Sequence, residues 1–225
     1  MTDHTLRLAV LDCDGTIVDS QTTIVNLIKK VFAQNNLEQP KPDLIRHTVG
    51  LHLMDAMEVL LDQNDRHLIK TLVGSYKELV AKYRADNSWE DPLYPHAKET
   101  IQILDADGWL LGVATGKSKR GLEMVLGHYG IIDHFCTTQT SDVGPGKPAP
   151  EMLYRAMSAT SVKPDNTVMI GDTTYDMEMA MNAGTRAIGV SWGYHTEEEL
   201  NRAGAQIIIH SFEELKGALV DLVGK

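Results

Sequence analysis

The apolar run Leu8-Ala9-Val10-Leu11, followed directly by Asp12-Cys13-Asp14-Gly15-Thr16, constrains the fold of this chain most. The run is typical of a buried strand. Because side chains alternate along a strand, Asp12 and Asp14 point to one side and Cys13 to the other. Two crowded carboxylates repel one another unless a cation lies close. A tight acidic turn is the ordinary alternative. We favour a metal-dependent site in which one carboxylate is a nucleophile and the other handles protons.

Composition narrows the class of protein. The 225 residues, 43% of them hydrophobic, can bury a sizeable core and carry a second small domain. The net charge of −10 and pI near 5.3 disfavour binding to nucleic acid or a membrane surface, which needs a basic face. The two cysteines, Cys13 and Cys136, lack paired spacing, which fits a reducing cytoplasm. We see neither a signal peptide nor a run of transmembrane length, and expect a cytoplasmic monomer or homodimer.

Further apolar runs of strand length alternate with helical patterns, as expected for β-α-β units around a parallel sheet. The runs cover residues 6–11, 109–114, 167–170, 185–190 and 206–209, with a weaker candidate at 135–138. Helix starts are expected at Pro95, Ser118 and Pro148–Pro150, because proline and serine suit a first helical turn.

The interval between Ser20 and Trp89 contains no convincing strand. It carries three apolar stripes at helical spacing: Ile24, Leu27, Ile28 and Val31; Met54, Met57, Leu60 and Leu61; and Leu68, Leu72, Tyr76, Leu79 and Tyr83. We therefore expect a helical cap over the sheet, with a return linker at 88–95 broken by prolines. The predicted division is a catalytic core of residues 1–17 and 92–225 and a cap of residues 18–91.

Polar residues follow three of the later runs. Thr115 and Gly116 precede a helix start, where exposed N–H groups favour phosphate. Lys147 lies in a loop stiffened by prolines, which fixes its ammonium group. Asp172 ends an apolar run and Asp176 follows one helical turn later; such oxygen ligands suit Mg²⁺. Each of these residues also has an ordinary explanation without a function. Thr115 could be a turn residue, Lys147 a solvated surface lysine and Asp172 a helix cap. Together they are much more specific, because strand ends of an open sheet share one ligand edge.

The order Asp-x-Asp-Gly-Thr, then Thr, then Lys-Pro, then Gly-Asp-x-x-x-Asp resembles the haloacid dehalogenase superfamily over essentially the whole chain. Its phosphoglycolate phosphatase-like branch is the most similar. The resemblance implies an α/β fold, a Rossmann-like parallel sheet with an inserted helical C1 cap. Asp14 favours P–O chemistry, because similar dehalogenases carry Tyr there and phosphonatases carry Ala.

The resemblance also implies roles for individual residues. Asp12 would attack phosphorus, and Asp14 would protonate the leaving alcohol and then activate water. Thr115 and the Gly116 N–H would hold phosphoryl oxygens, while Lys147 would balance charge around Asp12.

The same resemblance implies a Mg²⁺ site. The ligands would be the Asp12 carboxylate, the Asp14 main-chain carbonyl and the Asp172 carboxylate, with Asp176 as a supporting acid. Phosphoryl transfer asks mainly for such positioning and charge neutralisation.

Substrate choice is expected to depend on the cap, since a compact phosphate site accepts almost any monoester. Residues 46–52 are polar, contain a glycine and lie between helical stripes, like the family's cap loop that faces the active site. Arg46 and His52 are candidates to bind a substrate carboxylate; exposed surface positions are the alternative.

The leading interpretation is a Mg²⁺-dependent phosphatase of small phosphorylated metabolites. One alternative is a β-phosphoglucomutase-like phosphomutase, which uses the same acids, although Thr16 mildly favours hydrolysis. Another is a pyrophosphatase, with inorganic pyrophosphate as the substrate. A non-catalytic phosphoreceiver fits neither the order of the acids nor the cap. A dinucleotide-binding domain is disfavoured because no Gly-x-Gly-x-x-Gly follows the first strand.

Overall fold

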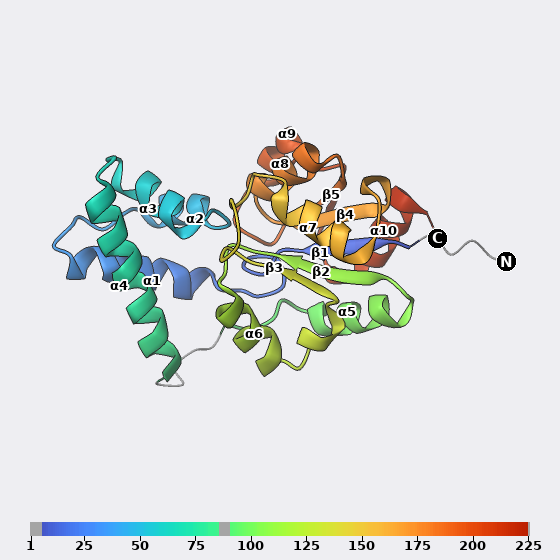
Figure 1. The fold of residues 1–225 in the computed structure, drawn as a ribbon, viewed down its shortest axis with the longest axis horizontal. Helices are drawn as coiled ribbons and strands as arrows, with labels where there is room; N and C mark the ends of the chain where they lie inside the picture. The colour runs from blue at the N-terminus through green and yellow to red at the C-terminus, as the bar shows by residue number, and fades with distance from the viewer. Residues whose placement is uncertain (1–5, 86–90, 225) are drawn as a thin grey trace.

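The computed structural model describes residues 6–85 and 91–224 and shows a parallel six-stranded sheet with helices on both faces (Figure 1). The strand order is β3-β2-β1-β4-β5-β6. The strands are β1 (Leu8–Leu11), β2 (Leu110–Ala114), β3 (Thr137–Gln139), β4 (Thr167–Gly171), β5 (Arg186–Val190) and β6 (Ile207–Ile209). Every predicted strand region contains a strand, although the weaker one at 135–138 shares only residues 137 and 138 with β3.

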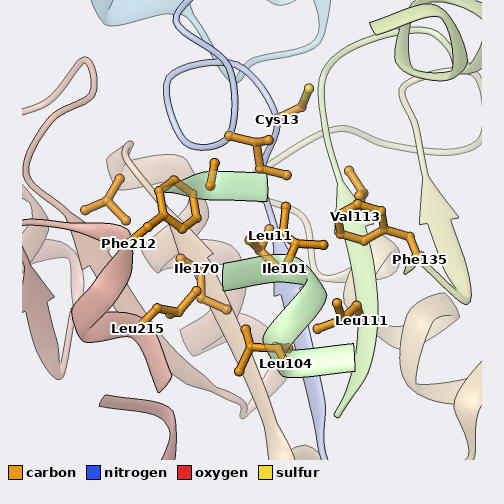
Figure 2. Close-up of a cluster of buried hydrophobic side chains, with 14 of the residues drawn as sticks. Leu11, Cys13, Ile101, Leu104, Leu111, Val113, Phe135, Ile170, Phe212 and Leu215 are labelled. Atoms are coloured by element: carbon orange, nitrogen blue, oxygen red, sulfur yellow. The ribbon is translucent and has the colours of Figure 1, made fainter. Parts of the chain in front are cut away.

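Two hydrophobic clusters lie on opposite faces of the sheet because strand side chains alternate. Helices α5 (Ala97–Ala106), α6 (Lys119–His128) and α10 (Leu215–Val223) cover one face; α7 (Glu151–Thr160), α8 (Thr174–Ala183) and α9 (Glu197–Ala203) cover the other. In β1, Leu11 belongs to the first cluster and Val10 to the second. Figure 2 shows the first cluster, in which Cys13 is also buried. Three short 3₁₀ turns lie between helices and strands: η1 (Ile132–His134), η2 (Pro164–Asn166) and η3 (Phe212–Glu214).

Strand β1 lies between β2 and β4, and the candidate site is expected beyond the carboxyl ends of these three strands. Leu11, its last residue, pairs with Val113 of β2 and with Ile170 of β4. The chain continues from β1 through β2 to β3 on one side, and from β4 through β5 to β6 on the other. Ligands of open α/β sheets bind at such a reversal of strand order, beyond the carboxyl ends of the strands.

A separate group of helices lies beside the sheet, at the left of Figure 1. It consists of α1 (Gln21–Gln34), α2 (Pro42–Thr48), α3 (Leu53–Leu61) and α4 (Arg66–Ala85) and has its own buried cluster, which includes Val31, Met57 and Leu72. The three predicted stripes lie in α1, α3 and α4. Of the predicted polar loop 46–52, residues 46–48 are instead the end of α2. This short helix buries Ile45 and starts at Pro42, a position that tolerates proline because its N–H would be unpaired.

Two chain segments running side by side connect the cap to the core. Val18 pairs antiparallel with Leu93, and the Asp19 N–H donates to the Pro92 carbonyl at 2.8 Å. Part of the predicted return linker, residues 88–90, lies outside the described residues. We retain the division at 17/18 and 91/92 as a proposal, supported by these paired linkers. No helix among the described residues combines the length and apolarity needed to cross a bilayer.

Candidate active site

Asp12 and Lys147 form a buried ion pair at the carboxyl end of β1. The Lys147 Nζ lies 2.9 Å from Asp12 Oδ1 and 2.5 Å from Asp176 Oδ1, and its side chain is fully buried. Burial opposes the charge on Lys147, but the two carboxylates outweigh it and raise its pKa above the ordinary value. Lys147 therefore stays protonated and fixes both acids.

The Asp12 carboxylate has one free oxygen. Its Oδ1 pairs with Lys147 and accepts the Cys13 N–H at 2.6 Å, whereas Oδ2 is buried without a hydrogen-bond partner among the described residues. Burial raises the pKa of Asp12 to about 7, and the charge of Asp176 adds to this while Lys147 opposes it. A buried, unpaired carboxylate oxygen is costly unless it binds a cation or a substrate.

Asp12, Asp172 and Asp176 can converge on one cation. One oxygen atom from each lies within 4.8 Å of the others, and all three residues are buried. Burial, with the charges of Asp12 and Asp176, raises the pKa of Asp172 well above its ordinary value. A divalent ion would offset this repulsion, and carboxylate oxygens suit Mg²⁺. The residues present therefore fit the expected metal.

Asp172 and Asp176 are held in different ways. Asp172 accepts hydrogen bonds from the Thr16 hydroxyl at 2.9 Å and the Tyr194 N–H at 2.9 Å. Asp176 pairs with Lys147 and caps α8, accepting from the Thr173 hydroxyl at 2.7 Å and N–H at 3.1 Å. Thr173 is the N-cap residue of α8, so Asp172 is not the helix cap that was the alternative to a metal ligand.

Asp14 makes a second ion pair, with a lysine that sequence reasoning missed. Lys117 Nζ lies 2.7 Å from Asp14 Oδ1, which also accepts the Ser20 hydroxyl at 2.5 Å. The exposed fractions of the Lys117 and Asp14 side chains are 15% and 12%. Lys117 follows Thr115 by two residues, so applying the strand-end reasoning to the whole turn after β2 would have found it.

Thr115 and Gly116 lie at the end of β2, directly under the cap. Thr115 is buried, and its hydroxyl accepts the Lys117 N–H at 3.2 Å. A Cβ added to Gly116 would lie 3.0 Å from the Leu51 carbonyl oxygen and 3.3 Å from that of Gly50. Glycine therefore allows this loop of the cap to approach the expected phosphate position.

Arg46 and His52, the two cap residues expected to bind a substrate carboxylate, have different surroundings. Arg46 lies in α2, where its Nη1 pairs with Asp43 at 2.8 Å and its side chain is 40% exposed. His52 caps α3, and its ring Nδ1 accepts the Met54 N–H at 3.3 Å. With Lys147, His52 lines a cavity of about 560 Å³ between α3 and the 144–149 loop. The structure thus brings His52 to the lysine loop and gives Arg46 a partner in its own helix.

A further contact between cap and core involves two histidines. Tyr175 donates to the His47 carbonyl at 2.9 Å, and the rings of His47 and His195 lie 4.9 Å apart. His47, His195 and Glu199 could group around a metal ion. However, His195 Nδ1 accepts the Thr174 N–H at 3.0 Å, so the neutral ring carries its proton on Nε2 and offers no free ligand atom there. We interpret the group as a packing contact.

The loop after β5 also reaches the site, which sequence reasoning missed. Trp192 donates from Nε1 to the Thr16 carbonyl at 3.1 Å. The Tyr194 hydroxyl lies 3.3 Å from the Ser20 hydroxyl, which itself binds Asp14. This loop follows the predicted strand at 185–190, so its position beyond a strand end was the available signal.

Comparisons with known proteins agree with this geometry. The family model described as haloacid dehalogenase-like hydrolase matches residues 9–190. A Dickeya dadantii protein named probable phosphatase IndB is 35% identical over 217 residues, covering 94% of this chain and 92% of that protein. A phosphoglycolate phosphatase of Mannheimia succiniciproducens is 27% identical, covering 93% of this chain and 96% of that one.

Solved structures share the architecture as well. A Bacteroides fragilis structure described as a haloacid dehalogenase-like hydrolase superposes with a TM-score of 0.87 at 25% identity, covering 94% of this chain and all of that one. The family match spans most of the chain and includes every strand that contributes an acid. The chain belongs to the haloacid dehalogenase-like hydrolases.

Proposed function

We propose that this protein is a Mg²⁺-dependent phosphatase of small phosphate monoesters that acts through an aspartyl-phosphate on Asp12 and resembles phosphoglycolate phosphatases. The observation that carries the proposal is the buried Asp12 carboxylate, fixed by Lys147 through one oxygen and unpaired at the other among the described residues. Relatives named phosphatase and phosphoglycolate phosphatase support the reaction class.

The metal would be held by the carboxylates of Asp12 and Asp172 and the main-chain carbonyl of Asp14, with Asp176 in support. When bound, Mg²⁺ supplies positive charge that stabilises the phosphoryl oxygens during transfer. Lys147 supplies a fixed positive charge on the Asp12 side. Thr115 and the Gly116 N–H donate to the phosphoryl oxygens.

In the first step, an Asp12 oxygen forms a bond to phosphorus while the bond from phosphorus to the ester oxygen breaks. The leaving oxygen takes the proton of the Asp14 carboxyl group and departs as the alcohol. In the second step, the Asp14 carboxylate removes a proton from water, whose oxygen attacks phosphorus. The bond between Asp12 and phosphorus breaks, which releases inorganic phosphate and restores both acids.

The cap would limit access of water and substrate to this site, because its 50–51 carbonyls lie over Gly116. The substrate is then a small phosphorylated metabolite, hydrolysed in the cytoplasm. The present contacts single out neither the phosphomutase nor the pyrophosphatase.

Turnover of p-nitrophenyl phosphate by the purified protein tests the proposal. We expect release of nitrophenol with Mg²⁺, none with EDTA, and recovery when Mg²⁺ is restored. A parallel screen should include phosphoglycolate, pyrophosphate and a hexose 1-phosphate, with analysis of all products. Isomerised hexose phosphate in place of free phosphate would contradict hydrolysis, and turnover unaffected by EDTA would contradict the metal requirement.

A further inference from the structure

Lys117 is a second lysine of the site, placed differently from Lys147. Lys147 already pairs with two carboxylates, Asp12 and Asp176, whereas Lys117 pairs with Asp14. Lys147 is fully buried and Lys117 is partly open, with 15% of its side chain exposed. Within residues 6–85 and 91–224, Lys117 has one acidic partner, and a cation with one such partner and access to solvent can exchange that partner for a ligand.

The backbone of Lys117 is anchored on both sides. Its N–H donates to the Thr115 hydroxyl at 3.2 Å, and its carbonyl accepts from the Ser141 N–H at 3.1 Å and from the Ser141 hydroxyl at 3.2 Å. Ser118 then caps α6. The base of the side chain is therefore fixed, and only its flexible carbon chain needs to move for the ammonium to change partner.

The Lys117 ammonium lies close to the position of the leaving group. To donate a proton, Asp14 must come within about 3 Å of the ester oxygen. Lys117 Nζ is 2.7 Å from Asp14 Oδ1, so it lies within roughly 6 Å of that oxygen. An anionic group one or two carbons from the ester oxygen can therefore reach Lys117 while the ester oxygen remains at Asp14.

Asp14 would keep a partner after such an exchange. The Ser20 hydroxyl donates to the same Asp14 oxygen at 2.5 Å, and Ser20 is buried. After the exchange, the Lys117 ammonium would pair with the ligand and Asp14 would pair with the Ser20 hydroxyl.

We propose that Lys117 determines substrate specificity by binding an anionic group on the leaving alcohol, and that this group displaces Asp14 from the ammonium. The preferred substrates are phosphate monoesters whose alcohol carries a carboxylate or similar anion next to the ester carbon. This inference rests on the proposed phosphatase function. An anion in this position releases Asp14 from Lys117, so that Asp14 can donate its proton to the ester oxygen. A neutral alcohol leaves Asp14 paired with Lys117.

Two substrates of equal carbon number test the proposal: phosphoglycolate, which has a carboxylate, and 2-hydroxyethyl phosphate, which has a hydroxyl group instead. We expect the wild type to prefer phosphoglycolate in kcat/KM. Lys117→Met should lose about 10- to 100-fold more on phosphoglycolate than on 2-hydroxyethyl phosphate, as expected for loss of a charge-assisted hydrogen bond. Lys117→Arg should retain part of the preference.

Lys119→Met is the matched control. Lys119 lies two residues further along, is 69% exposed and pairs with Glu123, so the change removes the same charge without touching Asp14. We expect this variant to keep the wild-type preference. Calorimetric binding of both esters to an Asp12→Asn protein, with and without Lys117→Met, should show the same selective loss in Kd without turnover.

The possible failures are distinguishable. Equal loss on both esters in Lys117→Met would make Lys117 only a positioning residue for Asp14 and overturn the inference, while the phosphatase function would stand. Selective loss in Lys119→Met as well would assign the preference to general electrostatics and also overturn it. If the wild type hydrolysed neither ester nor p-nitrophenyl phosphate with Mg²⁺, the proposed function itself would fail.

Discussion

The two lysine–aspartate pairs of the site differ in burial and in the number of their partners. Lys147 is fully buried between Asp12 and Asp176, in a loop that contains three prolines. Lys117 is partly exposed, pairs with Asp14 and lies in the turn before α6, just ahead of its N-cap residue Ser118. On the proposed mechanism, Lys147 would be a permanent counter-charge for the nucleophile, whereas Lys117 would be shared between the general acid and a substrate.

Asp12→Asn should have the largest effect of all. It removes the proposed nucleophile, which is the partner of Lys147, but keeps the shape of the side chain, so turnover should fall by about 10⁴-fold or more while the fold is retained. Steady-state kinetics and circular dichroism check this together. Retained activity with unchanged Mg²⁺ dependence would contradict the assignment.

The same substitution at each lysine sharpens the comparison directly. Lys147→Met leaves buried carboxylates without their cation and should cost about 3–5 kcal/mol of unfolding free energy. Lys117→Met breaks a pair that keeps some solvent exposure, and Asp14 retains the Ser20 hydroxyl as a partner, so this change should cost less than Lys147→Met. Urea denaturation in EDTA measures both, and equal destabilisation would show that the two pairs are energetically alike.

Mg²⁺ should stabilise the wild type by binding the acids on the Lys147 side. At a hundred times its Kd the ion adds about 2.7 kcal/mol, a rise in Tm of roughly 5–11 °C for a chain of this size. Because the pKa of Asp12 is raised to about 7, protons compete with the metal below that pH, so the rise should shrink as pH falls from 8 to 6. In Asp172→Asn, Mg²⁺ should raise Tm little at either pH. A rise in Tm as large as in the wild type would mean that the metal binds elsewhere.

Tyr175→Phe should have the smallest effect. It removes the hydrogen bond from Tyr175 to the His47 carbonyl, worth about 0.5–1.5 kcal/mol, between the core and the cap. We expect KM to rise by a few-fold at most and kcat to change little. A large fall in kcat would mean that this contact controls the chemistry as well as closure of the cap.

The two lysines also differ in how far the sequence alone could place them in the site. Asp12, Lys147 and Asp172 follow strand ends or lie in a proline-rich loop, and adjacent parallel strands must bring such positions together. For Lys117 the available signal was its position in the turn after β2. The residue type gave none, since most lysines in a turn are solvated, and the pairing with Asp14 depends on how β1 and β2 align. Helix α2 was missed because seven residues with a single buried aliphatic side chain, Ile45, give too short a periodic pattern.

Substrate contacts were the least predictable part of the site. The likeness of residues 46–52 to the family's cap loop makes Arg46 and His52 candidates, but whether a cap residue faces the core depends on the packing of α2 and α3. Arg46 pairs within its own helix, whereas the backbone of residues 50–52 approaches the core. Backbone approach of this kind is marked in the sequence only by the glycines that permit it, Gly50, Gly116 and Gly146.

The most direct test of the central claim is mass analysis of the acid-quenched Asp14→Asn protein after brief reaction with substrate and Mg²⁺. Loss of the general base should slow hydrolysis of the intermediate, so the peptide that contains Asp12 should gain the mass of one phosphoryl group. The double variant with Asp12→Asn should gain none. A phosphoryl group on another residue, or product formed with no modified peptide at any quench time, would contradict the account.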